Sequence, residues 1–380
     1  MKILHIIEGV DANLGGLPYA LFNILATEKM IGLHSEVLSI VPPPGTFDKS
    51  SFEYPCHLFS SSFPSRFKRS QSALQWLEMH IQKFDCLIIH SLWNLLSIQS
   101  AFMAAKHRKP YVIWPHGSLD PFDLQKKYLL KKAIGPWVIK KVLKKASYVC
   151  CTTALEAELL ESYGARPKIQ VLPLAVEKIK EEGHRDHFRQ TYNFREDDTV
   201  LLFLSRINYK KGLDILLRAL KLLQTRNPSY HPRIKLSIAG SGSEEYTLYI
   251  RNLVNQLDLT SIVTFCGLIN GKAKADAFAG SDCFVLPSMN ENFGIAVVES
   301  LQAGLPVLIS KNVYIWRSII EKQGGWVCDY SVESVYQQLN YILSHPQELV
   351  FRKSQAQLIG NQFTPQALSS RYFDFYHSIQ

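Results

Sequence analysis

Residues 283–303 read Cys-Phe-Val-Leu-Pro-Ser-Met-Asn-Glu-Asn-Phe-Gly-Ile-Ala-Val-Val-Glu-Ser-Leu-Gln-Ala. The first four are apolar, which predicts a short strand buried on both faces, and the polar turn after them ends at Gly294. An apolar run follows, and the helix it predicts is expected to stop before Gly304 and Pro306. The stretch therefore predicts a strand, a turn and a helix.

Short apolar runs of the same kind recur along the whole chain, each separated from the next by a longer stretch of helical periodicity. They cover residues 3–7, 36–41, 56–59, 86–90, 111–114, 148–151 and 169–172 in the first half, and 200–204, 234–239, 262–265, 283–286, 306–309 and 326–328 in the second. Strands that are apolar on both faces belong to parallel sheets covered by helices. Two doubly wound, Rossmann-like α/β domains are therefore predicted.

The length of the chain supports the same division. At 380 residues it exceeds the size at which one hydrophobic core usually keeps growing. We expect the domains at residues 1–180 and 181–363, facing a cleft, with the polar stretch 177–198 as the linker. Residues 364–380 begin with Thr-Pro and carry apolar residues at helical spacing, which predicts a helix. That helix either caps the second domain or crosses back to the first.

The composition excludes some classes of protein. Seven cysteines, an odd number with no Cys-x-x-Cys pair, indicate a reducing compartment. No run approaches the roughly 18–20 apolar residues of a membrane span, and the first apolar run is too short for a signal peptide. A cytoplasmic protein is expected, attached to a membrane at most at its surface. The net charge of +9 indicates an anionic partner, which can be a phosphate ligand, a lipid headgroup or a nucleic acid.

Two glutamates make residues 283–303 a candidate site, because ligands of open α/β sheets bind beyond the carboxyl ends of the strands. Glu291 lies in the turn, where backbone N–H groups from Phe293 onward can receive a phosphate. Glu299 is the only charged residue in 292–303, and a buried carboxylate needs a hydrogen-bond partner, which a ribose diol would supply. The alternative is that Glu291 caps the helix and Glu299 pairs with a basic side chain.

A second candidate lies where the apolar run 200–204 ends. That run leads directly into a basic segment that contains Arg206 and Lys211, and together these two residues can neutralise a leaving pyrophosphate without a metal ion. The alternative is a solvated basic loop. Gly240, in a Gly-Ser-Gly turn after the run 234–239, is a further turn expected near the ligand.

The first domain offers weaker candidates. Gly15 and Gly16 follow the first apolar run, and their flexible backbone can approach a phosphate or simply form a loop. His116 follows the run 111–114, where it can contact a substrate, orient a nucleophile or be structural.

The segment 122–146 carries paired lysines interleaved with apolar residues, and a break is expected near Gly135 and Pro136. This pattern fits an interfacial amphipathic helix on an anionic membrane. It equally fits a helix that covers the domain and holds its lysines in water.

These segments resemble glycosyltransferase family 4, the "group 1" retaining enzymes with the two-Rossmann GT-B architecture. The matching residues are Ser205-Arg-Ile-Asn-Tyr-Lys-Lys-Gly-Leu-Asp214, the stretch from Pro287 to Glu299, and Ala303-Gly-Leu-Pro-Val307. The resemblance is specific across about 200–330 and looser in the first domain.

The resemblance implies a role for each candidate residue. Glu291 would contact the transferred sugar, Arg206 and Lys211 the diphosphate, and His116 would lie near the acceptor. The donor-binding residues implied are Gly15, Gly16, Gly240, Gly267, Leu268, Asn292, Phe293, Gly294, Ile295 and Glu299. The C-terminal helix would cross back to the first domain.

The implied reaction transfers a sugar, with retention, from a UDP- or GDP-sugar to a saccharide or lipid-linked glycan, in surface polysaccharide biosynthesis. It needs neither a cofactor nor a metal ion, and the sequence shows no Asp-x-Asp motif or clustered His and Cys ligands. One alternative is a nucleotide-sugar epimerase or hydrolase of the same architecture. Another is a non-enzymatic basic protein that binds membrane or nucleic acid, although nucleic acid is not an expected partner of the enzyme.

Overall fold

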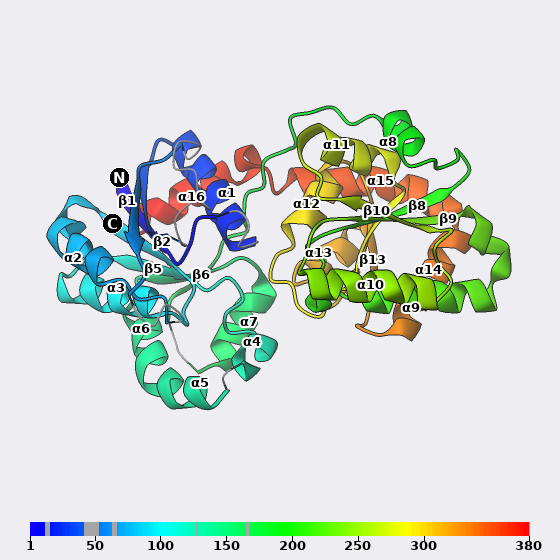
Figure 1. Cartoon of the computed structure of the whole chain (residues 1–380). Coiled ribbons are helices and arrows are strands. Elements are labelled where there is room, and N and C mark those ends of the chain that lie inside the picture. The colour runs from blue at the N-terminus through cyan, green and yellow to red at the C-terminus, as the bar shows by residue number, and fades with distance from the viewer. Residues whose placement is uncertain (12–15, 42–52, 63–66, 127, 165–166, 380) are drawn as a thin grey trace. The chain divides into compact units, whose positions relative to one another are not determined.

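The computed structural model describes residues 1–11, 16–41, 53–62, 67–126, 128–164 and 167–379 (Figure 1). The chain forms two compact units, one of Met1–Ala175 with Pro365–Gln380 and the other of Val176–Thr364. Each unit contains one parallel sheet surrounded by helices (Figure 1). The predicted fold class, two doubly wound α/β domains, is confirmed.

The first unit is built on a seven-stranded sheet, counted over the described residues, with the order β3-β2-β1-β4-β5-β6-β7. Its strands are β1 (Lys2–Ile7), β2 (His34–Val41), β3 (Cys56–Ser60), β4 (Cys86–His90), β5 (Tyr111–Trp114), β6 (Tyr148–Cys151) and β7 (Ile169–Val171). Its helices are α1 (Gly16–Met30), α2 (Gln71–His80), α3 (Leu95–Lys106), α4 (Pro121–Gln125), α5 (Tyr128–Ile134), α6 (Lys140–Lys145), α7 (Ala154–Ser162) and α16 (Pro365–His377). Leu21 and Leu25 of α1 pack on Ile7 and Val37, whereas α2, α3 and α6 join a separate core cluster.

The second unit is built on a sheet of six described strands in the order β10-β9-β8-β11-β12-β13. Its strands are β8 (Thr199–Leu204), β9 (Ile234–Ala239), β10 (Val263–Gly267), β11 (Cys283–Leu286), β12 (Val307–Ser310) and β13 (Gly325–Cys328). Its helices are α8 (Arg185–Thr191), α9 (Leu213–Arg226), α10 (Glu244–Gln256), α11 (Gly271–Gly280), α12 (Ile295–Gln302), α13 (Trp316–Glu321), α14 (Val332–Ser344) and α15 (Pro346–Asn361).

The strand order places a topological switch point in each sheet. The chain moves outward from β8 through β9 to β10, and then returns to the other side of β8 to form β11. In the second sheet β11 pairs with β8 through Cys283 and Leu201, so the loops that follow these two strands leave the same edge side by side. A switch point of this kind is where open α/β sheets bind ligands.

Every apolar run predicted as a strand is a strand, with ends shifted by no more than two residues. All residues of β4, β5, β11 and β12 are buried. Burial on both faces explains why these strands are apolar apart from His90 at the end of β4 and Ser310 at the end of β12, and why their pattern predicted a parallel sheet.

The helix α16 belongs to the first unit, as the resemblance implied. Tyr372 and Tyr376 are completely buried there. The Tyr372 hydroxyl donates to the Pro173 carbonyl over 3.0 Å, and the Tyr376 hydroxyl donates to the Glu28 carboxylate. The crossing of the C-terminal helix back to the first domain is therefore confirmed.

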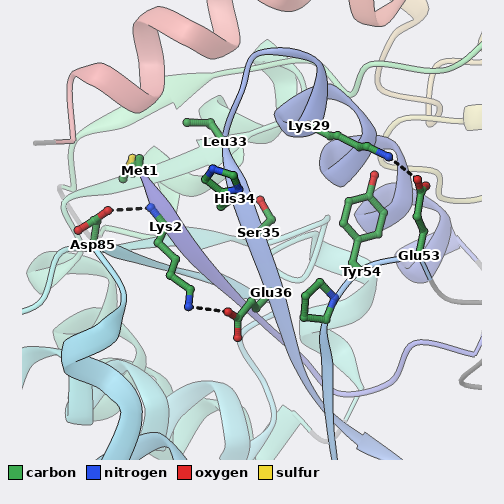
Figure 2. Close-up of a pocket in the computed structure, with 11 residues that line it drawn as sticks. Met1, Lys2, Lys29, Leu33, His34, Ser35, Glu36, Glu53, Tyr54 and Asp85 are labelled. Carbon is green, nitrogen blue, oxygen red and sulfur yellow. Dashed lines mark hydrogen bonds and ion pairs between the residues drawn. The ribbon is translucent and has the colours of Figure 1, made fainter.

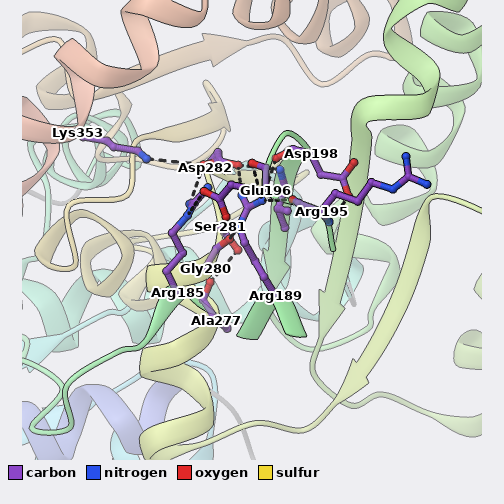
Figure 3. Close-up of polar contacts among 11 residues, drawn as sticks. Arg185, Arg189, Arg195, Glu196, Asp198, Ala277, Gly280, Ser281, Asp282 and Lys353 are labelled. Carbon is purple, nitrogen blue, oxygen red and sulfur yellow. Dashed lines mark hydrogen bonds and ion pairs between the residues drawn. The ribbon is translucent and has the colours of Figure 1, made fainter. Parts of the chain in front are cut away.

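The linker predicted at 177–198 is wrong for most of its length, because α8 lies inside it and belongs to the second unit. Figure 3 shows the polar contacts that this segment makes. Arg189 is 2% exposed, and its guanidinium lies 2.7 Å from the Asp282 carboxylate. It also donates to the carbonyls of Gly280, Arg195 and Asp198 over 3.1, 2.6 and 3.2 Å. The polar residues of α8 and of the turn that follows it therefore form a satisfied network rather than a solvated link.

Candidate active site

The loops after β8 and β11 are tied together at the switch point of the second sheet. The Lys210 carbonyl accepts hydrogen bonds from the Met289 amide over 2.7 Å and from the Ser288 hydroxyl over 2.9 Å. Gly212 has a φ of 69°, and a Cβ at this position would lie 1.9 Å from the Pro287 carbonyl oxygen. Only glycine fits this contact, so the Lys-Gly turn is held against the start of the β11 loop.

Lys211 and Glu291, which the sequence placed in separate motifs, form an ion pair. The Lys211 side chain is 13% exposed and that of Glu291 is 22% exposed. The Glu291 backbone is fixed as well, because its N–H donates to the Asn312 carbonyl and its carbonyl accepts from the Tyr314 N–H. A cation and a carboxylate therefore stand together at the ligand-binding edge of the sheet.

Gly294 is the N-cap residue of α12. It has the left-handed backbone conformation and makes no side-chain cap hydrogen bond. Glu291 is therefore paired with Lys211 rather than acting as the helix cap. Uncapped N–H groups at a helix N-terminus attract anions. Phe293 is 3% exposed and packs edge-on to Phe363, so only its backbone can serve a ligand; Ile295 is half-buried.

Glu299 on α12 pairs with Lys274 on α11, where Lys274 Nζ lies 2.6 Å from Glu299 Oε1. The alternative stated for Glu299, pairing with a basic side chain, therefore describes this structure. Both side chains remain partly open, at 15% exposed for Glu299 and 20% for Lys274. The contact through Oε1 leaves Oε2 as a second acceptor position on the same carboxylate. Lys274 was not predicted, because a lysine within a helix carries no local signal of its distant partner.

The remaining donor-side candidates lie along the same sheet edge. Arg206 is exposed directly after β8, and Gly240 follows β9, where a Cβ would lie 1.9 Å from the Ser205 carbonyl oxygen. Gly267 ends β10, and its carbonyl accepts from the Gly240 N–H over 2.7 Å. Leu268, next in the chain, is 66% exposed. The loops after β8, β9, β10 and β11 thus carry all the candidates in this unit outside α12.

The first unit holds the other predicted residues. Gly16 begins α1, where an added Cβ would lie in open space, whereas Gly15 lies outside the described residues. His116 follows β5 with a φ of 50°, and its Nε2 lies 2.8 Å from His90 Nδ1. Burial lowers the pKa of His116 to about 3, so the ring is neutral at pH 7.

A cavity of about 670 Å³ opens in the first unit, at the other edge of its sheet (Figure 2). It is lined by the starts of β1 and β2, among them Lys2, His34 and Glu36. The charged groups of this cavity already have partners. Lys2 Nζ lies 2.7 Å from the Glu36 carboxylate, and the Asp85 carboxylate accepts a hydrogen bond from the Lys2 amide over 2.7 Å. Open α/β sheets bind ligands at carboxyl ends, so this cavity is not the candidate site.

A metal centre was not expected from the sequence. Across the described ranges no three His, Cys, Asp or Glu side chains gather in a way that could hold a metal ion. The independence of the reaction from metal ions and cofactors stays a prediction.

Two family models match successive parts of the chain, "Glycosyl transferase 4-like domain" over residues 36–175 and "Glycosyl transferases group 1" over residues 184–361. The chain belongs to the group 1 glycosyltransferases. The second match covers the whole β8 to β11 edge of this glycosyltransferase, with Lys211, Glu291 and Glu299 inside it. The family that the sequence resembles is therefore confirmed.

The relatives of this glycosyltransferase are partial matches. An uncharacterized glycosyltransferase of Methanocaldococcus jannaschii is 32% identical over 160 residues, which are 42% of this chain and 39% of the relative. The alpha-monoglucosyldiacylglycerol synthase of Streptococcus pneumoniae is 25% identical over 254 residues, which are 64% and 56% of the two chains. The chain thus spans about half the length of the curated relatives it matches.

Solved structures share the fold over the full length. HepE of Anabaena in complex with UDP superposes with a TM-score of 0.81 at 19% identity and covers 100% of both chains. Sucrose-phosphate synthase of Thermosynechococcus elongatus has a TM-score of 0.79 at 17% identity and covers 99% of this chain and 98% of its own. At these identities the likeness establishes the architecture.

Proposed function

We propose that the chain is a retaining glycosyltransferase that moves a sugar from a UDP- or GDP-sugar to a saccharide or lipid-linked glycan, in surface polysaccharide biosynthesis. The observation that carries this proposal is the Lys211–Glu291 pair beside the uncapped N-terminus of α12, at the switch point of the second sheet. Two named relatives support it: HepE has been solved with UDP-glucose, and the pneumococcal relative is named for a glucosylated lipid product.

In this proposal the second unit holds the donor. The N–H groups at the start of α12, Lys211 and Arg206 bind the diphosphate, while Glu291 accepts a hydrogen bond from the transferred sugar. A ribose diol donates to Glu299, whose Oε1 is occupied by Lys274. Gly240, Gly267 and Leu268 lie beside the nucleotide.

Retention follows if the acceptor attacks the face from which the diphosphate leaves. The acceptor oxygen bonds to the anomeric carbon, the bond from that carbon to the phosphate oxygen breaks, and the departing phosphate takes the hydroxyl proton. The negative charge that builds on the diphosphate is balanced by Lys211 and Arg206, so the step needs no metal ion.

The ribose contact gives a binding prediction. Glu299→Ala is expected to raise the Kd for the donor nucleotide about 10–150-fold, since hydrogen bonds to a charged group contribute about 1.5–3 kcal/mol. Isothermal titration calorimetry with the free nucleotide measures this. Glu321→Ala, an exposed glutamate at the end of α13, is the matched control and should bind as wild type. An unchanged Kd in Glu299→Ala would remove Glu299 from the site.

The activity itself is tested with a panel of UDP- and GDP-sugars. The correct donor should raise the melting temperature, because it binds only the folded protein, and should be consumed when an acceptor is supplied. If no nucleotide sugar stabilises the protein or is turned over, the proposal fails. Fast donor breakdown that ignores every acceptor would favour the hydrolase instead.

We further propose that residues 122–146 attach the enzyme to the cytoplasmic face of an anionic membrane. The segment consists of α4, α5, the π-helical turn Gly135–Ile139 at the predicted break, and α6. Its surface carries Leu129 at 80% and Trp137 at 81% exposed, together with exposed lysines such as Lys144 and Lys145. In the part of the chain that the structure describes, no helix is long and apolar enough to span a membrane.

Liposome flotation tests this attachment. Vesicles containing anionic lipid should carry the protein upward, and Lys144→Glu with Lys145→Glu should reduce the bound fraction to that seen with neutral vesicles, since each lysine near such a surface contributes about 1 kcal/mol. The same change at Lys178 and Lys180, exposed in the second unit, is the control for net charge. Equal losses in both double variants would show that only total charge matters and would rule out a site at 122–146.

A further inference from the structure

A hydrogen-bonded relay of four side chains runs through the first unit from Glu28 on α1 to His116. Its links are His5 Nε2 to Glu28 Oε2 at 2.9 Å, His5 Nδ1 to His90 Nε2 at 3.0 Å, and His90 Nδ1 to His116 Nε2 at 2.8 Å. Glu28, His5 and His90 are 0% exposed, whereas His116 is half-buried. Successive imidazole rings are nearly parallel, at 22° and 20°.

The carboxylate end of the relay fixes its direction. Glu28 accepts from the Ser35 hydroxyl over 2.5 Å, and from the Tyr376 hydroxyl of α16. Ser35 also lines the cavity of Figure 2. With two hydroxyl donors already bonded to it, the Glu28 carboxylate acts as an acceptor here, and His5 then donates to it through Nε2–H.

Each neutral imidazole has one donor nitrogen and one acceptor nitrogen, so the choice made at His5 passes along the relay. If His5 donates to Glu28, its Nδ1 accepts from His90 Nε2–H, and His90 Nδ1 in turn accepts from His116 Nε2–H. The pKa of His90 lies well below its usual range, mainly because the ring is buried and in smaller part because His116 and His5 are neighbours. Burial also lowers the pKa of His116. Both rings are therefore neutral, and His116 keeps its proton on Nε2 and a lone pair on Nδ1.

The loop holds His116 in place at some energetic cost. Its φ of 50° is a left-handed conformation that a non-glycine residue rarely adopts. The ring stacks on Trp114 with centroids 5.9 Å apart, and the next residue is anchored by Gly117 N–H donating to Glu156 Oε1 over 2.6 Å. A buried polar relay and a strained backbone are both unfavourable compared with apolar packing, which favours a functional reason for the orientation of this ring.

We propose that Glu28, His5 and His90 are positioning residues that hold His116 as the Nε2–H tautomer, so that Nδ1 accepts a hydrogen bond from a substrate hydroxyl. The inference rests on the proposed function, together with the place near the acceptor that the family resemblance implies for His116. In this proposal α16 has a function as well, because its Tyr376 hydroxyl is one of the donors that bind the Glu28 carboxylate.

The tautomer can be read directly in the ligand-free protein. Two-bond ¹H–¹⁵N correlation spectra of ¹⁵N-histidine-labelled protein distinguish a protonated from an unprotonated ring nitrogen, and His116→Gln, His90→Gln and His5→Gln assign the signals. All three rings are expected to carry the proton on Nε2. A proton on Nδ1 of His116 in the wild-type protein overturns the proposal, whether or not the protein transfers sugar.

Glu28→Gln is the decisive variant, because its amide can donate to His5 Nε2 and so reverse the whole relay. His116 is then expected to carry its proton on Nδ1 instead of Nε2, and kcat to fall roughly 10–100-fold, as when a group orienting an active imidazole is removed, with the donor KM little changed. Tyr111→Phe removes another buried hydrogen bond of this unit, the 2.6 Å contact to the Val142 carbonyl, and should change neither readout.

The outcomes separate the two proposals. A Glu28→Gln protein that loses the tautomer without losing kcat contradicts the role of the relay in turnover. A wild-type protein with the expected tautomer but no transfer from any nucleotide sugar contradicts the proposed function instead. If Glu28→Gln does not fold, the wild-type spectrum still decides the tautomer, and His90→Gln, compared with Tyr111→Phe, decides the kcat effect.

Discussion

Replacing Lys211 by alanine is expected to lower kcat for sugar transfer by about 10²–10³-fold, the usual loss when one electrostatic contact to a transition state is removed. Lys211 is 13% exposed at the switch-point edge, where a cation is little screened by water. Charge grows on the diphosphate only as its bond to the sugar breaks, so the loss should fall on kcat more than on KM. Steady-state kinetics with the identified donor measure both parameters.

The ion pair with Glu291 requires a further comparison, because Lys211→Ala also leaves that carboxylate without its partner. In a Glu291→Gln background, Lys211→Ala should still lower kcat if the lysine contacts the diphosphate, and should add nothing if it only orients Glu291. Lys221→Ala, on α9 and bonded to Gln224 over 2.9 Å, controls for the loss of a lysine. Wild-type turnover in both Lys211→Ala and Glu291→Gln would mean that the reaction centre lies elsewhere.

The fold could be predicted from the sequence because its central strands are buried on both faces. Such strands are apolar at nearly every position, so the run Cys283-Phe-Val-Leu286 is recognisable without any partner. The helix α8 was missed for the opposite reason. Its arginines look solvated locally, and Asp282, the carboxylate that pairs with Arg189, lies 93 residues away.

The candidate site likewise has a part that could be predicted from the sequence and a part that could not. Residues at strand ends, such as Lys211 and Glu291, could be predicted because topology alone brings those ends to one edge. The pairing of these two residues, 80 positions apart, could not. His5 lies inside the apolar strand β1 and His90 ends the apolar strand β4. A single histidine in such a strand breaks no pattern, and only the pairing of β1 with β4 brings the two together.

Arg189→Ala is expected to lower the free energy of unfolding of the second unit by about 3–5 kcal/mol, the range measured when one partner of a buried ion pair is removed. The substitution takes away the 2.7 Å contact to Asp282 and leaves the carbonyls of Gly280 and Arg195 without this donor. Asp282 keeps the Val200 N–H at 2.9 Å, the Arg185 guanidinium at 3.2 Å and Lys353 Nζ at 3.7 Å, which places the loss at the lower end of that range. Urea unfolding followed by tryptophan fluorescence, with Trp316 and Trp326 in this unit, measures the change.

The matched control is Arg233→Ala, which removes an arginine at 73% exposure that lies 4.0 Å from Asp197. Exposed pairs contribute little, so this variant should unfold close to wild type. A loss for Arg189→Ala no greater than for Arg233→Ala would mean that the network of Figure 3 contributes nothing net. Phe188, which is 3% exposed and so close to Gly280 that a Cβ there would lie 2.5 Å from its ring, would then be what holds α8 in place.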